Sequence, residues 1–145
     1  MLYFFGNSQV SWISQKQRIV AQSSCEAEYV AATSATCQGI WLSRLIGEIL
    51  GKEADRSVLL IDNQSAIALC KNPVFHERSK HIDVRYHLVR NCVEKKKLAV
   101  EYVKTEEQLA DILTKPLARF RFQALKEKIG IKLIGPDIKI KGVKC

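Results

Sequence analysis

The pattern of apolar and polar positions is most distinctive where four branched apolar residues, Val58 to Ile61, run directly into Asp62. A continuous apolar run of this length is typical of a strand that is buried on both faces of a sheet. Such strands belong to α/β proteins, in which ligands bind just beyond the carboxyl ends of the strands. The pattern therefore places Asp62 where a functional acid would lie. The alternative is that Asp62 or Asn63 only caps the helix that follows.

Four further apolar segments have the length and composition of strands. They are Leu2 to Phe5, Val10 to Ile13, Ile19 to Ala21 and Leu98 to Val103. The residues Gly6, Asn7 and Ser8 between the first two segments indicate a hairpin turn. Strands that alternate with helical patterns favour an α/β fold.

The longest predicted helix begins at a capping box formed by Ser23 and Glu26 and ends at Gly51. At about 100° per residue, one face is small at its start and bulky at its end, as in a helix that lies on a sheet. This face consists of Ala31, Ala32, Ala35, Gly39, Leu42, Ile46, Ile49 and Leu50. Glu28 lies on the same face, whereas Glu26 lies nearly opposite and is expected to be solvated. Because an unpaired acid on a buried face is costly, Glu28 indicates an ion pair, a metal ligand or a catalytic group.

Shorter helices are predicted over residues 64–70 and 82–95, and a third follows a second capping box at Thr105 to Gln108. The third helix carries Asp111 in its first turns and breaks before Pro116. A last helix over residues 117–128 ends at Gly130. We expect one domain over residues 1–131 and a basic tail over 132–145.

Composition narrows the class of protein. The 145 residues are 47% hydrophobic, which is enough for one packed domain, and the net charge of +8 favours an anionic partner such as nucleic acid. No apolar run has membrane-spanning length, and the chain does not begin as a signal peptide does. Five cysteines without a C-x-x-C spacing favour reduced thiols in an intracellular protein over a zinc site. Trp12 and Trp41 are expected in the core.

Three acids are candidates for one site: Glu28, Asp62 and Asp111. In an α/β fold they could converge at one edge of the sheet. Clustered carboxylates need cations, and their hard oxygen atoms suit Mg²⁺ or Mn²⁺. Two such ions can activate water and stabilise the leaving oxygen of a phosphodiester, while a basic surface holds the polyanionic substrate.

Four segments carry a specific family resemblance. They read SSCEAEY from Ser23, DNQSA from Asp62, KHID from Lys80 and QLADILTKPL from Gln108. In this order they strongly resemble the ribonuclease H domain of Ty1/copia-type retrotransposon Pol polyproteins. The resemblance implies a ribonuclease H-like α/β fold, with a mixed five-stranded sheet flanked by helices. It also implies Mg²⁺-dependent cleavage of the RNA strand of RNA–DNA hybrids during reverse transcription.

The resemblance further implies partners and a location. The partners would be an RNA–DNA hybrid and the reverse transcriptase portion of the same polyprotein, with no membrane, and the domain would be monomeric. It would lie in the cytoplasm, within a virus-like particle, or in the nucleus. We expect the residues that contact nucleic acid to be Asn63, Gln64, Arg78, Lys80 and His81. The loop with His76 and His81 is expected to be substrate-facing or structural rather than catalytic.

The family uses four metal-binding acids, usually Asp, Glu, Asp and Asp. Glu28 matches the glutamate, because the segment that it opens fits the family's Glu-x-x-Ala pattern, and Asp62 and Asp111 match the second and last aspartates. The first aspartate normally lies on the opening strand, but no acid occurs from Met1 to Cys25. The chain thus resembles a member that is truncated at its N-terminus and lacks the first strand, and we expect it to be impaired as a nuclease.

Two alternatives remain open from the sequence. The chain could be a non-catalytic remnant that binds nucleic acid or serves only as a structural domain. It could also be an unrelated small α/β protein in which the acids are helix caps, so that Asp62→Asn and Glu28→Gln would change stability alone.

Overall fold

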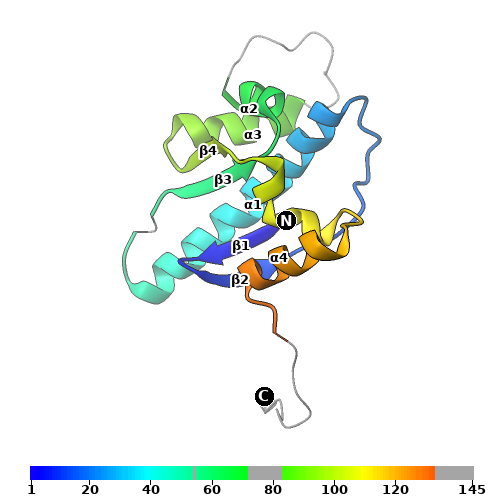
Figure 1. The fold of residues 1–145 in the computed structure, drawn as a ribbon. Coiled ribbons are helices and arrows are strands. Elements are labelled where there is room, and N and C mark those ends of the chain that lie inside the picture. Colours follow the sequence, from blue (N-terminus) through cyan, green and yellow to red (C-terminus); the bar gives the residue numbers. More distant parts are fainter. Residues whose placement is uncertain (54, 72–82, 133–145) are drawn as a thin grey trace. The chain divides into compact units, whose positions relative to one another are not determined.

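A computed structural model describes residues 1–53, 55–71 and 83–132, of which 83–87 are described through their backbone alone (Figure 1). The described residues form a mixed α/β structure with two separate two-stranded sheets. They divide into two compact units. The first unit contains Met1 and Ile13–Gln108, and the second contains Leu2–Trp12 and the residues from Leu109 onward. Among these residues, no helix is long and apolar enough to cross a membrane.

The elements of the first unit are α1 (Ser24–Leu50), β3 (Ser57–Ile61), α2 (Gln64–Lys71), α3 (Asp83–Glu94), β4 (Leu98–Tyr102) and the 3₁₀ turn η2 (Thr105–Glu107). Strands β3 and β4 are parallel, with Leu59 opposite Val100. Parallel neighbours require a crossover connection, which here contains α2 and α3. These strands and helices confirm the α/β expectation.

The helix α1 forms where the sequence predicts it. The Ser23 hydroxyl accepts a hydrogen bond from the Glu26 N–H (3.1 Å), and Gly51 ends the helix in the left-handed conformation, with φ of 63°. The prediction for its far end is wrong, because Ile49 and Leu50 are exposed. A helix of 27 residues is about 40 Å long, whereas strands of five residues span about 17 Å. The last turns of α1 therefore extend past the strands.

The core of the first unit lies on one face of the β3–β4 pair. Residues from all three helices share it with the inward side chains of both strands. The cluster consists of Tyr29, Ala32, Ile61, Ala66, Ile67, Cys70, Val89, Cys92, Leu98 and Val100. On the opposite face, Val58 is 55% exposed and Leu60 is 50% exposed. The expectation that this strand is buried on both faces is therefore wrong, because the three helices cover the same face.

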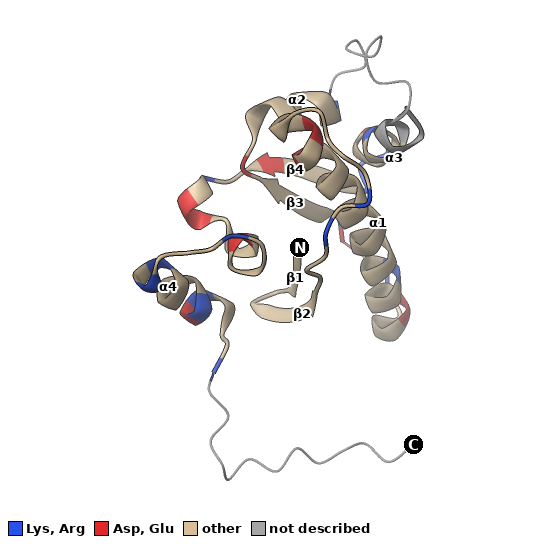
Figure 2. Cartoon of the chain, turned by 90° about the vertical axis from the view of Figure 1, so that its right-hand side faces the viewer, with Lys and Arg blue, Asp and Glu red and all other residues tan. Residues whose placement is uncertain are grey.

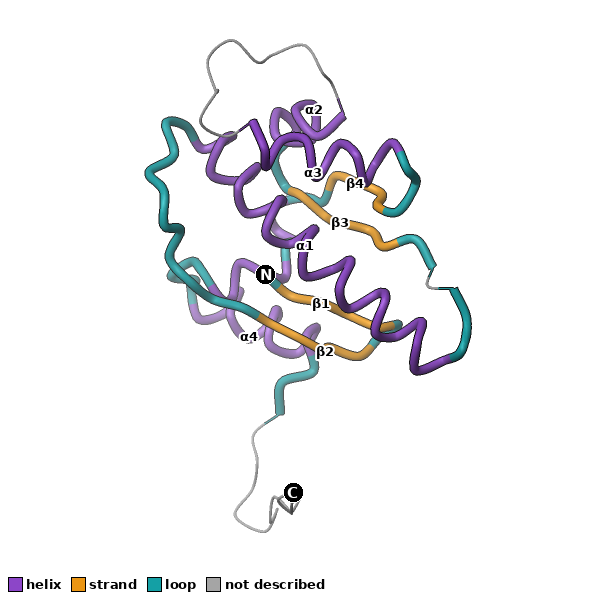
Figure 3. Tube along the Cα trace, turned by 180° about the vertical axis from the view of Figure 1, so that it is seen from behind, coloured by secondary structure: helices purple, strands orange, loops and turns teal. Residues whose placement is uncertain are grey.

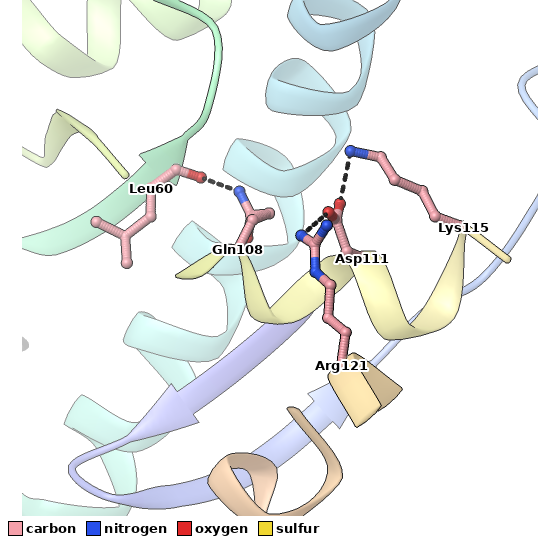
Figure 4. A network of polar contacts seen from close by, with 5 residues as sticks. All are labelled: Leu60, Gln108, Asp111, Lys115 and Arg121. Carbon is pink, nitrogen blue, oxygen red and sulfur yellow. Dashed lines mark hydrogen bonds and ion pairs between the residues drawn. The ribbon is translucent and has the colours of Figure 1, made fainter. Parts of the chain in front are cut away.

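The second edge of β3 is also accessible. The Ile61 carbonyl accepts from the N–H of Val103, just beyond β4, so Ile61 faces the β4 edge. In a parallel ladder, alternate residues direct their backbone groups to opposite edges of the strand. The backbone N–H and C=O groups of Val58 and Leu60 therefore point to the edge of β3 that faces away from β4. No strand among the described residues pairs there. The Leu60 carbonyl instead accepts from the side-chain amide of Gln108, at 3.5 Å (Figure 4).

The elements of the second unit are β1 (Leu2–Phe5), β2 (Ser8–Trp12), the 3₁₀ helix η3 (Leu109–Leu113) and α4 (Arg119–Ile129). The strands form the predicted antiparallel hairpin, and Gly6 in its turn has φ of 58°. Gly130 ends α4 in the left-handed conformation, as the sequence predicts. Leu125 and Ile129 are the buried residues of α4.

Three local predictions are wrong. Ile19 to Ala21 form no strand and belong to the loop that precedes α1 (Figure 3). The predicted helix after Thr105 is two 3₁₀ segments, because Gln108 between them is extended, with ψ of 101°, and no side chain caps the first. Trp12 and Trp41 are 63% and 55% exposed rather than in the core.

Candidate functional site

Asp62 lies at the carboxyl end of β3 and is half-buried. The next residue, Asn63, caps α2, because its side-chain oxygen accepts a hydrogen bond from the Ala66 N–H (3.0 Å). Its backbone carbonyl also accepts from the Ile67 N–H. The hydrogen bond that caps α2 at the Ala66 N–H therefore belongs to Asn63. The sequence left these two residues as alternatives, and the structure assigns the cap to Asn63.

The environments of the two α1 glutamates differ from those that the sequence predicts. Glu26 is buried at 9% exposure, and its carboxylate accepts from the backbone N–H of Gln22 (2.8 Å). The expectation of a solvated Glu26 is therefore wrong. Glu28 is half-buried in the same turn. The first half of α1 buries residues on more than one face, since Thr33 and Thr36 are 5% and 1% exposed, so a single buried face does not describe it.

Glu28 and Asp62 flank the same core. Glu28 precedes Tyr29, which is 0% exposed, and Asp62 follows Ile61, which is 4% exposed. Both apolar neighbours belong to one core cluster, in which α1 packs against β3. Each of these two acids is therefore the chain neighbour of a residue of this core cluster.

Asp111 lies in η3 of the second unit and is 3% exposed. One carboxylate oxygen accepts from the Lys115 ammonium and the other from the Arg121 guanidinium, each at 2.9 Å (Figure 4). The two cations are more exposed than the acid, with side chains at 44% and 34%. Asp111 is therefore the counter-ion of two cations, and its ion pair with Arg121 joins η3 to α4. Sequence reasoning missed both partners, although the four-residue spacing of Asp111 and Lys115 is a recognised ion-pair signal.

The chemistry of the three acids suits a hard divalent cation, since all are carboxylates. Among the side chains of residues 1–53, 55–71 and 88–132, no group of three or more His, Cys, Asp or Glu forms a metal site. The convergence of Glu28, Asp62 and Asp111 stays a prediction. Gln64 is exposed at the start of α2. The remaining predicted nucleic-acid contacts, at positions 78, 80 and 81, lie outside the described residues.

The buried thiols of the first unit are held in their neutral form. Burial, reinforced by the neighbouring Cys25 thiol, raises the pKa of Cys70 to about 12. Burial also raises the pKa of Cys25 and of Cys92. Because the thiolate is the nucleophile and the metal ligand, the raised pKa disfavours both roles for Cys70 near neutral pH. Cys37, in contrast, is exposed.

The chain is similar over nearly its whole length to retrotransposon Pol polyproteins. It is 42% identical over 136 residues to the retrovirus-related Pol polyprotein from transposon RE1 of Arabidopsis thaliana, which covers 94% of this chain and 9% of that protein. It is 45% identical over 130 residues to the one from transposon TNT 1-94 of Nicotiana tabacum, covering 90% and 10%. The truncated transposon Ty1-A Gag-Pol polyprotein of Saccharomyces cerevisiae is 29% identical over 128 residues, covering 88% and 11%.

These similarities identify the class of sequence. The chain corresponds to a section of a Ty1/copia-type retrotransposon Pol polyprotein. It spans about a tenth of the length of the curated relatives that it matches. No family model and no solved structure matches the chain.

Proposed function

We propose that this section is a ribonuclease H domain, which hydrolyses the RNA strand of RNA–DNA hybrids with Mg²⁺ or Mn²⁺. The observation that carries the proposal is the position of Asp62. It is an acid at the carboxyl end of a parallel strand, where α/β proteins bind ligands, and the helix-capping role belongs to its neighbour. Glu28 is a further carboxylate of the first unit, next in the chain to Tyr29, which belongs to the same core cluster as Ile61.

In this proposal Glu28, Asp62 and Asp111 hold the metal. Bound divalent ions would supply the activation of water and the stabilisation of the leaving oxygen. The Asp111 carboxylate forms ion pairs with Lys115 and Arg121, and Lys115 is the more exposed of these two cations. The net charge of +8 supports binding of a polyanionic hybrid, with an affinity that falls as salt rises.

We also propose that the site is completed by a strand supplied from outside residues 1–145. Residues 1–25 contain no acid, so neither strand of the hairpin supplies a further carboxylate. The second edge of β3 directs the backbone groups of Val58 and Leu60 outward, and both side chains are half-exposed. An added strand would form backbone hydrogen bonds with this edge of β3. If it ended in an aspartate beside Asp62, it would add a fourth carboxylate to the three proposed ligands. The chain alone is then a weak nuclease.

The proposal is tested with an RNA–DNA hybrid labelled on the RNA strand, incubated with the pure chain and Mg²⁺. The assay is then repeated with the chain extended at its N-terminus by the residues that the retrotransposon encodes immediately upstream. We expect cleavage by the extended form and its loss in Asp62→Asn. Asp55→Asn is the matched control, because Asp55 is an exposed acid in the loop before β3. Equal activity in Asp62→Asn and Asp55→Asn would refute the assignment of Asp62.

One observation favours a second candidate function, a non-catalytic domain that binds nucleic acid. Both oxygens of Asp111 already hold protein cations, as in a structural ion pair. This candidate predicts weak Mg²⁺ binding by calorimetry, for the chain and for its extended form, together with hybrid binding that falls steeply with salt. A ribonuclease H domain instead predicts that the extended form gains Mg²⁺ affinity.

A further inference from the structure

The solvent face of α4 combines an aromatic side chain with basic ones. Phe120 is 88% exposed in the first turn, whereas Leu125 and Ile129, on the other side of the helix, are 2% and 7% exposed. The helix carries four cations and one acid in eleven residues, and Figure 2 shows the basic positions at both of its ends. Packing within the second unit therefore explains one face of α4 and leaves Phe120 unexplained.

The cations of α4 have different roles. Arg121 is engaged with the Asp111 carboxylate (2.9 Å). Arg119, next to Phe120, is exposed, and Lys128 is exposed near the end of the helix. An exposed ring and an exposed guanidinium in the same helical turn are the groups that bind single-stranded nucleic acid, in which a base stacks on the ring and cations follow the phosphates.

We propose that this face of α4 binds a single-stranded nucleic-acid segment, with a base stacked on Phe120 and a phosphate held by Arg119. A single strand is favoured over a duplex because the bases of a duplex already stack on one another and present no free face to the ring. A nucleic acid is favoured over an apolar protein surface because the exposed positions of α4 include the cations Arg119 and Lys128 besides the acid Glu127, in a chain of net charge +8. The source of the strand, an unpaired stretch that flanks an RNA–DNA hybrid, rests on the proposed function.

The test uses the full chain and a short fluorescent single-stranded RNA that contains 2-aminopurine, without added metal. Stacking on one aromatic side chain strengthens binding by about 1–3 kcal/mol per base, so Phe120→Ala should weaken binding at least about fivefold and remove the quenching of 2-aminopurine. Arg119→Gln should weaken binding and reduce the slope of log affinity against log salt by about one.

Two matched controls separate this contact from general effects. Trp41→Ala removes an aromatic residue that is 55% exposed on α1, and Lys52→Gln removes an exposed cation from the loop after α1. Both should leave RNA binding unchanged. Circular dichroism and the urea midpoint should be the same for Phe120→Ala and the parent chain, because the ring makes little packing contact.

The outcomes separate this inference from the proposed nuclease function. Weaker single-strand binding in Phe120→Ala supports the inference even if no form of the chain cleaves a hybrid. Unchanged binding in Phe120→Ala overturns it even if the extended chain cleaves. Loss of self-association in Phe120→Ala with unchanged RNA binding also overturns it, because the face would then contact protein.

Discussion

Replacing Asp111 by asparagine should destabilise the second unit, because it leaves two cations facing a neutral side chain. Removing one partner of a fully buried ion pair costs about 3–5 kcal/mol. Here the acid is 3% exposed, but Lys115 and Arg121 are 44% and 34% exposed, so water stabilises the stranded charges in part. We therefore expect a loss of about 1–3 kcal/mol in the free energy of unfolding. Urea denaturation followed by circular dichroism measures it.

The variants of the two cations sharpen this prediction. Arg121→Gln should cost more than Lys115→Gln, because Arg121 is less exposed and joins η3 to α4, whereas Lys115 lies one turn from Asp111. A double-mutant cycle between Asp111→Asn and Arg121→Gln should give a coupling energy above about 0.5 kcal/mol. Asp55→Asn, an exposed control, should stay within about 0.5 kcal/mol of the parent chain. A loss in Asp111→Asn no larger than in this control would refute the structural role of the ion pairs.

The remaining predictions concern the first unit and the two proposals. Because burial raises the pKa of Cys70 from 9.0 to about 12, the unfolded chain loses this proton at lower pH than the folded chain. Stability should therefore fall as pH rises above about 9, by up to about 1.4 kcal/mol per pH unit from this thiol, and a Cys70→Ala chain should show a shallower slope in urea denaturation at pH 8 to 10.5. Ser23→Ala should cost about 1 kcal/mol through loss of the α1 cap, whereas Ser24→Ala should cost less; equal losses would contradict the capping assignment. For α4, Phe120→Ala should weaken binding of single-stranded RNA without a change in stability, as measured by fluorescence.

The boundaries of the elements could be predicted wherever local chemistry sets them. The Ser23 cap and Gly51 fix both ends of α1, and Gly130 fixes the end of α4, because the cap residue and the left-handed glycine act on their own turn. The exposed face of β3 could not be predicted. Four apolar residues in a row are compatible with one or two covered faces, and only the arrangement of α1, α2 and α3 decides between them.

In the candidate site, too, local sequence patterns predicted some features and the packing of the helices decided others. Asp62 and Glu28 were identified from a strand end and a helical face, and the structure keeps both near one core. The prediction of a solvated Glu26 was wrong, because a helical wheel assumes one buried face and the first half of α1 has more than one. The contact between Arg121 and Asp111 spans ten residues and a change of element, so no local spacing rule reaches it.

The most direct test of the account is a cleavage assay that compares the 145-residue chain with the chain extended by its preceding coding sequence. Both are given the same RNA–DNA hybrid and Mg²⁺. The account predicts little cleavage by the chain alone, and clear cleavage by the extended chain that Asp62→Asn abolishes and Asp55→Asn does not. Strong cleavage by the chain alone would contradict the need for an added strand. Cleavage by the extended chain that survives Asp62→Asn would contradict the assignment of the site.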